Sequence, residues 1–298
     1  MLYPLSYRGV GGGTTKAIFR FQRISKGGPQ FKFELDQDLS RHQDAAIDAM
    51  EGNSAIGIVG FGRFGKLMAR YLAVDCPVRV YDPSAQPHEV ASAGAQPASL
   101  EAAAQCRVVI LAVPISCLQQ ALEQIGPHLG PGSIVADVCS VKEAPVEWMQ
   151  QQLPPTTPIL ATHPMFGPDS AAESLEGRKI VICPVRMPPE RCEAIRRYLR
   201  AKGLVVIETT PAEHDRQIAV SLALTHYIGR SLAEMGAKPQ DIDSEGYQRL
   251  LRILDVVEND TWQLFEDMHR FNRYALEARR DFLKAMQAVE RRIGDGVR

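Results

Sequence analysis

Hydrophobic residues follow two different patterns along the middle of the chain. Between residues 55 and 208, short unbroken apolar runs alternate with stretches in which apolar residues recur every three or four positions. Unbroken runs are typical of parallel strands covered on both faces, and the wider spacing is typical of amphipathic helices. The predicted strands are 55–59, 78–81, 108–113, 133–138, 159–162, 179–183 and 204–207. The alternation predicts an α/β fold with a doubly wound, Rossmann-type parallel sheet.

After residue 209 the pattern becomes purely helical. Thr210 is a predicted N-cap, Pro211 takes the first helical position, and Glu213 is placed to close a capping box. Helical periodicity then continues almost to the end of the chain, which predicts a second, all-helical domain. We therefore expect a poorly ordered extension at 1–52, an α/β domain at 53–209 and a helical domain at 210–298.

A glycine-rich segment, Gly-Phe-Gly-Arg-Phe-Gly, directly follows the first predicted strand. The spacing of Gly60, Gly62 and Gly65 lets the backbone turn tightly, approach a pyrophosphate and pack the next helix onto the strand. The phosphates would then lie at a helix N-terminus, beside Arg63 and Phe64. This segment predicts a dinucleotide site; the alternative is a glycine-rich turn in an unrelated α/β protein.

Asp82 follows the second predicted strand, where a carboxylate can accept hydrogen bonds from an adenosine ribose. Its charge would repel a 2′-phosphate and favours NAD over NADP, although Arg63 could offset this, so NADP stays possible. The alternative is that Asp82 only initiates the turn before Pro83.

Ser140 lies between a predicted strand and a predicted helix, three residues before Glu143. This spacing fits a capping box, yet a capping hydroxyl can still donate its own proton to a ligand. Both a structural and a catalytic role therefore stay open. Lys142 is either a solvated residue of the first helical turn or a substrate-binding residue that faces the cleft.

His163 follows the strand at 159–162, and Pro164 favours an extended conformation for it. It should project from the carboxyl edge of the sheet, where open α/β folds bind ligands. An imidazole there can accept a proton from an alcohol near neutral pH. The alternative is a loop histidine bonded to its own backbone. His214, in the first helical turn after residue 209, either lines the same cleft or is an ordinary polar residue.

Composition narrows the function further. The chain has 298 residues, 45% hydrophobic and 23% charged, with a formal net charge of −1. We expect a soluble globular protein without affinity for nucleic acid or membranes. The six cysteines form no C-x-x-C pair and no framework typical of secreted proteins, which favours the reducing cytoplasm. No histidines and acids have the spacing of metal ligands, so no metal is expected.

Three short motifs follow the glycine loop in a fixed order. They are Ser-Val-Lys at 140–142, Thr-His-Pro-Met-Phe-Gly-Pro-Asp-Ser at 162–170 and Glu-His-Asp at 213–215. Together they resemble the prephenate/arogenate dehydrogenase family of tyrosine biosynthesis, from about residue 54 to about 290. The C-terminal part is similar to the arogenate-using plant-type branch. The resemblance implies NAD(P)-dependent oxidative decarboxylation of prephenate or arogenate by a homodimer formed through the helical domain.

The resemblance also implies individual roles. His163 would be the base for the C4 hydroxyl of the substrate ring, and Ser140 would hold that hydroxyl. The nicotinamide would lie near Val113 and Pro114.

One position departs from the family pattern. Many bacterial members place a carboxylate-binding arginine where this chain has Asp255. We expect Arg252, Arg249 or Arg230 to replace it, since a guanidinium binds carboxylates well. Asp260 could pair with the amino group of arogenate.

Two other function classes stay open. One is another dehydrogenase with a Rossmann domain and a helical domain, of the β-hydroxyacid or imine reductase type. The other is a non-catalytic NAD-binding sensor.

Overall fold

The computed structural model describes residues 7–8, 14–15 and 55–294. The chain forms two compact units, residues 1–48 and residues 49–298. In the first unit, β1 (Tyr7–Arg8) pairs antiparallel with β2 (Thr14–Thr15). The rest of the predicted extension at 1–52 lies outside the described residues.

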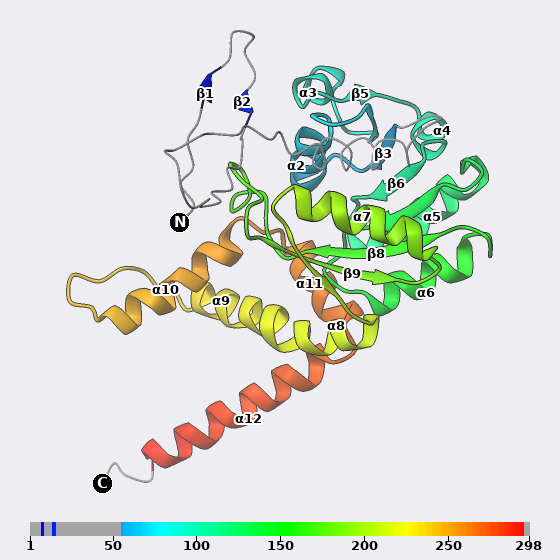
Figure 1. Ribbon diagram of the computed structural model, residues 1–298. Coiled ribbons are helices and arrows are strands. Elements are labelled where there is room, and N and C mark those ends of the chain that lie inside the picture. Colours follow the sequence, from blue (N-terminus) through cyan, green and yellow to red (C-terminus); the bar gives the residue numbers. More distant parts are fainter. Residues whose placement is uncertain (1–6, 9–13, 16–54, 295–298) are drawn as a thin grey trace, which may run out of the picture. The chain divides into compact units, whose positions relative to one another are not determined.

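The described part of the second unit contains an eight-stranded sheet with the order β10-β9-β8-β7-β6-β3-β4-β5 (Figure 1). Its strands are β3 (Ile56–Val59), β4 (Val78–Tyr81), β5 (Gln96–Pro97), β6 (Val108–Leu111), β7 (Ile134–Asp137), β8 (Ile159–Pro164), β9 (Lys179–Pro184) and β10 (Val205–Glu208). This confirms the Rossmann-type architecture. The two-residue strand β5 was not predicted, because it has no apolar run.

One strand pair departs from the expected parallel order. β8 and β9 are antiparallel, and His163 pairs with Val181 in that ladder. Pairing with β9 carries β8 on to Pro164, so the predicted strand end at residue 162 was wrong. His163 consequently lies within a strand and not in the loop that follows it.

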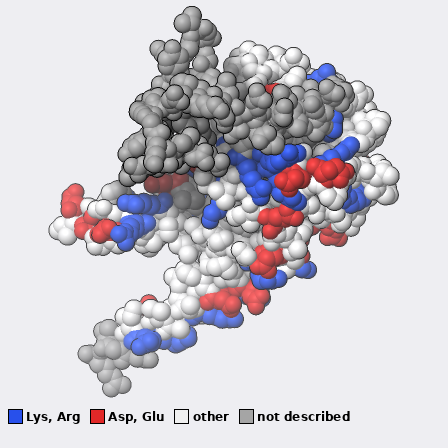
Figure 2. Space-filling view, in the orientation of Figure 1, with Lys and Arg blue, Asp and Glu red and all other residues white. Residues whose placement is uncertain are grey.

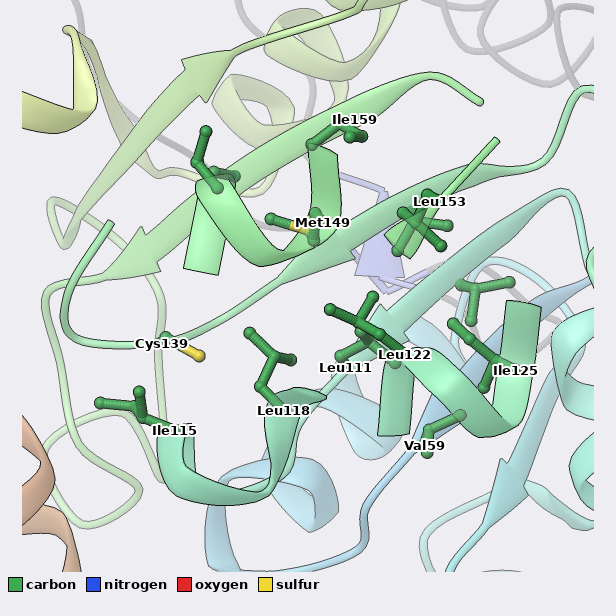
Figure 3. Close-up of a cluster of buried hydrophobic side chains, with 14 of the residues drawn as sticks. Val59, Leu111, Ile115, Leu118, Leu122, Ile125, Cys139, Met149, Leu153 and Ile159 are labelled. Atoms are coloured by element: carbon green, nitrogen blue, oxygen red, sulfur yellow. The ribbon is translucent and has the colours of Figure 1, made fainter. Parts of the chain in front are cut away.

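Helices cover both faces of the sheet, as a doubly wound fold requires. On one face lie α4 (Leu100–Ala104), η1 (Ile115–Cys117), α5 (Leu118–Ile125), η2 (Gly126–His128) and α6 (Glu143–Gln152). On the other face lie α2 (Arg63–Leu72), α3 (Pro87–Ser92) and α7 (Pro189–Ala201). Figure 3 shows side chains of α5 and α6, among them Leu122 and Met149, pointing at the strand residues Leu111 and Ile159. Burying each such side chain contributes about 1.5–3 kcal/mol, so these contacts fix the strands that carry the site.

The strand register places several loops side by side. Tyr81, Val59, Leu111, Asp137 and Ala161 are successive Cα partners across β4, β3, β6, β7 and β8. These five strands are parallel, so the segments that follow them all emerge at the same edge of the sheet. That edge is where ligands bind in open α/β folds.

From residue 211 to residue 294 the second unit is helical, as predicted. This helical region comprises α8 (Pro211–Ile218), the π-helix η3 (Ala219–Ala223), α9 (Leu224–Glu234), α10 (Glu245–Glu258), α11 (Trp262–Phe271) and α12 (Ala275–Gly294). The Thr210 hydroxyl accepts a hydrogen bond from the Glu213 N–H at 3.2 Å, which confirms the predicted N-cap. The Glu213 carboxylate bonds instead to Arg216 and Gln217. The division at residue 209 into separate domains stays a prediction.

Helix α12 presents an apolar stripe to solvent. Its exposed side chains recur every three, four or seven positions, on one face: Leu276, Leu283, Met286, Val289 and Ile293. Acidic and basic groups are interspersed along α12 and the neighbouring surface in Figure 2, in keeping with the nearly neutral net charge. Among the described residues, none of the helices has the length and apolarity that a bilayer span requires.

Candidate functional site

The glycine loop after β3 has the shape of a phosphate cradle. Gly60 has a φ of +102°, and a Cβ there would lie 2.5 Å from the carbonyl oxygen of Ala112. A Cβ on Gly65 would lie 2.3 Å from the Gly60 carbonyl oxygen. Both positions therefore require glycine.

Gly62, between them, is different. It is the N-cap of α2, and no atom of the described residues lies within 4 Å of the position a Cβ would take. Within residues 55–294, no side chain caps this end of α2. The open space at Gly62 and the uncapped N–H groups fit the pyrophosphate of a dinucleotide.

Asp82 lies beside this cradle. Its Oδ2 accepts a hydrogen bond from the Phe61 N–H at 2.6 Å, and its Oδ1 accepts one from the Ser84 N–H at 2.7 Å. The two predicted roles are therefore compatible: the carboxylate stabilises the turn after β4 and also adjoins the glycine loop, where it can meet a ribose.

Arg63, in contrast, is engaged by protein groups. One guanidinium nitrogen donates to both carboxylate oxygens of Asp169, at 2.6 and 2.7 Å, and another donates to the Asn259 carbonyl at 2.8 Å. The Phe64 ring lies 6.0 Å from that of Phe166. Both side chains thus connect the glycine loop to the segment after β8. Asp169 pairs with the guanidinium that could have offset the repulsion between Asp82 and a 2′-phosphate.

The segment after β6 borders the same cradle. Cγ1 of Val113 lies 3.1 Å from the position of a Cβ on Gly60, and Pro114 follows on the surface. Asp267 of α11 fixes this segment, since its Oδ2 accepts hydrogen bonds from the Ser116 N–H at 3.0 Å and hydroxyl at 2.8 Å. The helical region therefore holds the loop at which a nicotinamide was expected.

Ser140 does not form the predicted capping box. Helix α6 begins at Glu143 with Lys142 as its N-cap, and the buried Ser140 hydroxyl has no hydrogen-bond partner among the described residues. The N-terminus of α6 is capped instead by Asp215 of α8, which accepts from the N–H groups of Lys142 (2.7 Å) and Glu143 (2.9 Å). A buried hydroxyl without a partner is costly, and a ligand oxygen at this edge would satisfy it.

Lys142 lies in neither of its predicted places. Its side chain is fully buried, and its ammonium donates to Asp137 Oδ2 and, at 2.5 Å, to the Thr162 carbonyl. The expected substrate contact is therefore wrong for this structure. The residue is an internal cation that joins β7 to β8.

His163 and His214 form a buried pair. His163 is 6% exposed, and its Nδ1 lies 2.8 Å from Nε2 of His214. His214 Nδ1 lies 2.7 Å from Oδ1 of Asp215. Both ring nitrogens of His214 are thus engaged, so it supports His163 and does not line the cleft as expected. The alternative of a His163 bonded to its own backbone is wrong as well.

The pKa of His163 is lowered well below its ordinary value of 6.5, first by burial and then by the neighbouring His214 and Lys142. Burial disfavours the charged form of an imidazole. His163 is consequently neutral at pH 7, the form that can accept a proton.

The four residues predicted to bind charged groups of the substrate fall into two groups. Arg230 donates to the Asp260 carbonyl, and the Asp260 carboxylate lies 3.8 Å from the buried His226. Arg249 pairs with Glu245 at 2.5 Å on the exposed side of α10, and Arg252 is exposed on the same helix. The structure therefore brings Arg230 and Asp260 together and leaves the other two arginines on the surface.

Three acidic residues of the site were not predicted, namely Asp169, Asp215 and Asp267. Each bonds a residue more than 70 positions away. Asp169 and Asp215 do stand in the motifs at 162–170 and 213–215, but nothing local showed which distant groups they bond.

Comparison with known proteins identifies the family. The family model described as "Prephenate dehydrogenase, nucleotide-binding domain" matches residues 68–208, and the one described as "TYRAAT1-like, C-terminal domain" matches residues 231–297. Arogenate dehydrogenase 1, chloroplastic, of Arabidopsis thaliana is 30% identical over 248 residues, which are 80% of this chain but only 39% of that protein. Arogenate dehydrogenase 2, chloroplastic, of the same plant is 30% identical over 262 residues, covering 80% of this chain and 69% of that protein.

A solved structure agrees in fold. The prephenate dehydrogenase from A. aeolicus in complex with hydroxyphenyl propionate and NAD+ superposes with a TM-score of 0.65 at 20% identity, covering 81% of this chain and 91% of that one. The chain belongs to the prephenate/arogenate dehydrogenase family and is similar to its plant-type members.

Proposed function

We propose that this protein is an NAD-dependent dehydrogenase that oxidises and decarboxylates arogenate, prephenate or both. The observation that carries the proposal is a neutral, buried His163 on the same sheet edge as an open glycine cradle and a Ser140 hydroxyl that has no partner within residues 55–294. The relatives named arogenate dehydrogenase support the substrate class. Since the chain spans only 39% of the first of them, its activity and substrates are proposals.

The chain's own residues supply a base, an orienting hydroxyl and a binding surface. A dinucleotide bound at the cradle would supply the acceptor for the hydride from C4 of the substrate ring. His163 takes the proton of the C4 hydroxyl through the ring nitrogen that does not face His214. The Ser140 hydroxyl bonds the same substrate oxygen and holds it at the base. Loss of CO2 from C1 then makes the ring aromatic, and the base contributes about 10²–10⁴-fold to the rate.

Two carboxylates support NAD rather than NADP. Asp82 adjoins the glycine loop and would repel a 2′-phosphate. Asp169 accepts hydrogen bonds from the guanidinium of Arg63, which is therefore less available to bind a 2′-phosphate. On the substrate side, Arg230 bonds the backbone carbonyl of Asp260, whose carboxylate lies 3.8 Å from His226. A guanidinium and a carboxylate brought together in this way would suit a carboxylate beside an amino group, which favours arogenate.

The test is a substrate screen with the purified protein. NADH formation and CO2 release are measured with arogenate, prephenate and small β-hydroxyacids, each with NAD+ and NADP+. Turnover of arogenate or prephenate with NAD+ is expected. Turnover of a small hydroxyacid alone would indicate another dehydrogenase class, and tight NAD+ binding without turnover would indicate a sensor.

We also propose a homodimer formed through the helical region. The stripe of five exposed apolar residues on α12 supports it, because contiguous exposed apolar surface is typical of interfaces. Met286→Glu should shift the protein from dimer to monomer in sedimentation, whereas Gln287→Glu, an equal charge on the neighbouring exposed position, should not. A wild-type monomer would contradict the proposal.

The cytoplasm is our proposed location. The six cysteines are free thiols, which suits a reducing compartment. The Arabidopsis relatives are named chloroplastic, so fractionation of the source cells is the test.

A further inference from the structure

Three buried side chains form a hydrogen-bonded chain beneath the predicted base. His163 Nδ1 lies 2.8 Å from His214 Nε2, and His214 Nδ1 lies 2.7 Å from Asp215 Oδ1. Each of the three residues is at most 6% exposed. His163 comes from β8 of the sheet, whereas His214 and Asp215 come from α8. The hydrogen bonds therefore link the sheet to the helical region.

Asp215 is fixed in one orientation. Its Oδ1 accepts from the Lys142 N–H at 2.7 Å and its Oδ2 from the Glu143 N–H at 2.9 Å. The Asn272 amide donates to the Asp215 backbone carbonyl at 2.8 Å. Backbone N–H groups can only donate, so both carboxylate oxygens act as acceptors. The carboxylate cannot turn away from His214 without leaving the N-terminus of α6 uncapped.

This orientation determines where each imidazole carries its proton. Because Asp215 Oδ1 accepts, the hydrogen in the 2.7 Å contact belongs to His214 Nδ1. A neutral imidazole has one N–H, so His214 Nε2 is an acceptor, and the hydrogen in the 2.8 Å contact belongs to His163 Nδ1. The lone pair of neutral His163 is therefore on Nε2, which has no hydrogen-bond partner among the described residues.

We propose that His214 and Asp215 are positioning residues that hold the proton of neutral His163 on Nδ1 and thereby make Nε2 the atom that accepts the substrate proton. The second half of this inference rests on the proposed function. There the O–H bond at C4 breaks, its proton goes to Nε2 and its electrons form a C=O bond. The hydride would leave C4 with its own electron pair for the NAD+ of the proposed function, which would be reduced to NADH. The C1–carboxylate bond then breaks, CO2 leaves, and that electron pair passes through the ring to the oxygen, which regains a proton.

The same hydrogen bonds stabilise His163 after it has become charged. Once Nε2 has taken a proton, His163 still donates from Nδ1 to His214, and the Asp215 carboxylate offsets part of the new charge. Of the charged groups around His163, Lys142 opposes this charge but is itself paired with Asp137. Asp215 is thus the carboxylate that this hydrogen-bonded chain connects to the base.

The tautomer can be measured without substrate or cofactor. In the full chain labelled with ¹⁵N-histidine, long-range ¹H–¹⁵N spectra distinguish protonated from bare ring nitrogens, and His163→Asn assigns the signals. We expect His163 to carry its proton on Nδ1 in the wild type and in His214→Gln, whose amide oxygen can still accept. In His214→Leu the Nδ1–H signal should be lost or reduced. A wild-type His163 protonated on Nε2 would overturn the proposal.

Kinetics provide the second readout. His214→Leu should lower kcat by roughly 10²–10⁴-fold with little change in KM, and His214→Gln should restore most of that loss. Glu213→Gln is the matched control, since its side chain bonds only within α8 and it should keep wild-type kcat. A His214→Leu enzyme with wild-type kcat would refute the inference. If the wild type oxidises neither arogenate nor prephenate, the proposed function fails, and the spectra still decide the tautomer.

Discussion

Gly62→Ala separates folding from cofactor binding. The backbone φ at Gly62 is −64°, and no atom of the described residues lies within 4 Å of the position of a Cβ. The folded protein therefore accepts alanine without strain. Alanine restricts the unfolded chain, which adds about 0.4–1 kcal/mol, but it is a poorer N-cap than glycine, which offsets this gain. We therefore expect the free energy of unfolding to stay within about 1 kcal/mol of the wild type and Tm within about 4 °C.

The same methyl group should impair NAD+ binding. It enters the open space at the N-terminus of α2, where the pyrophosphate is expected to approach the backbone most closely. Losing one charge-assisted hydrogen bond there costs about 1.5–3 kcal/mol, which is roughly a 10- to 150-fold increase in Kd. Calorimetric titration of the purified protein with NAD+ measures the Kd, and a thermal scan without cofactor measures Tm.

Gly126→Ala is the matched control. Gly126 begins η2, its φ is −47°, and no described atom lies within 4 Å of its Cβ position. It should be at least as stable as the wild type, because alanine restricts the unfolded chain, and it should keep the wild-type Kd for NAD+. If Gly62→Ala bound NAD+ within twofold of the wild type, the phosphates would not lie on this loop.

Two further predictions concern buried charge. Lys142→Met should lower the free energy of unfolding in urea by roughly 3–5 kcal/mol, because it leaves the fully buried Asp137 without its cation; a loss below about 1 kcal/mol would contradict this. Acid should also destabilise the protein, since burial lowers the pKa of His269 from 6.5 to about 4. The unfolded chain therefore binds a proton first, and stability present above pH 6.5 is lost progressively as the pH falls toward 4. Urea titrations across this range should show a shallower loss for His269→Gln, and an unchanged slope would exclude His269 as a contributor.

Local patterns predicted most of the fold because burial and helix geometry are local properties. The apolar runs located seven of the eight strands. The spacing of Gly60, Gly62 and Gly65 located the phosphate cradle after β3. What the patterns could not show was contact between distant segments. The cap of α6 comes from Asp215, which is 72 positions from Glu143, so the capping box that the spacing of Ser140 and Glu143 suggested does not form.

Charge was the other source of error. A lysine in a first helical turn is usually solvated, but Lys142 is buried because Asp137 and the Thr162 carbonyl converge on its ammonium. Similarly, β9 pairs antiparallel with β8, and this pairing extends β8 past residue 162. The sequence could not show this, because apolar runs do not reveal strand direction. In each case the missing information was the identity of a partner distant in sequence.

The most direct test of the account replaces the proposed base. His163→Asn should lower turnover of arogenate and prephenate by roughly 10²–10⁴-fold, while the Kd for NAD+, measured by titration, stays within about twofold of the wild type. Turnover close to that of the wild type in this variant would contradict the assignment of His163 as the proton acceptor.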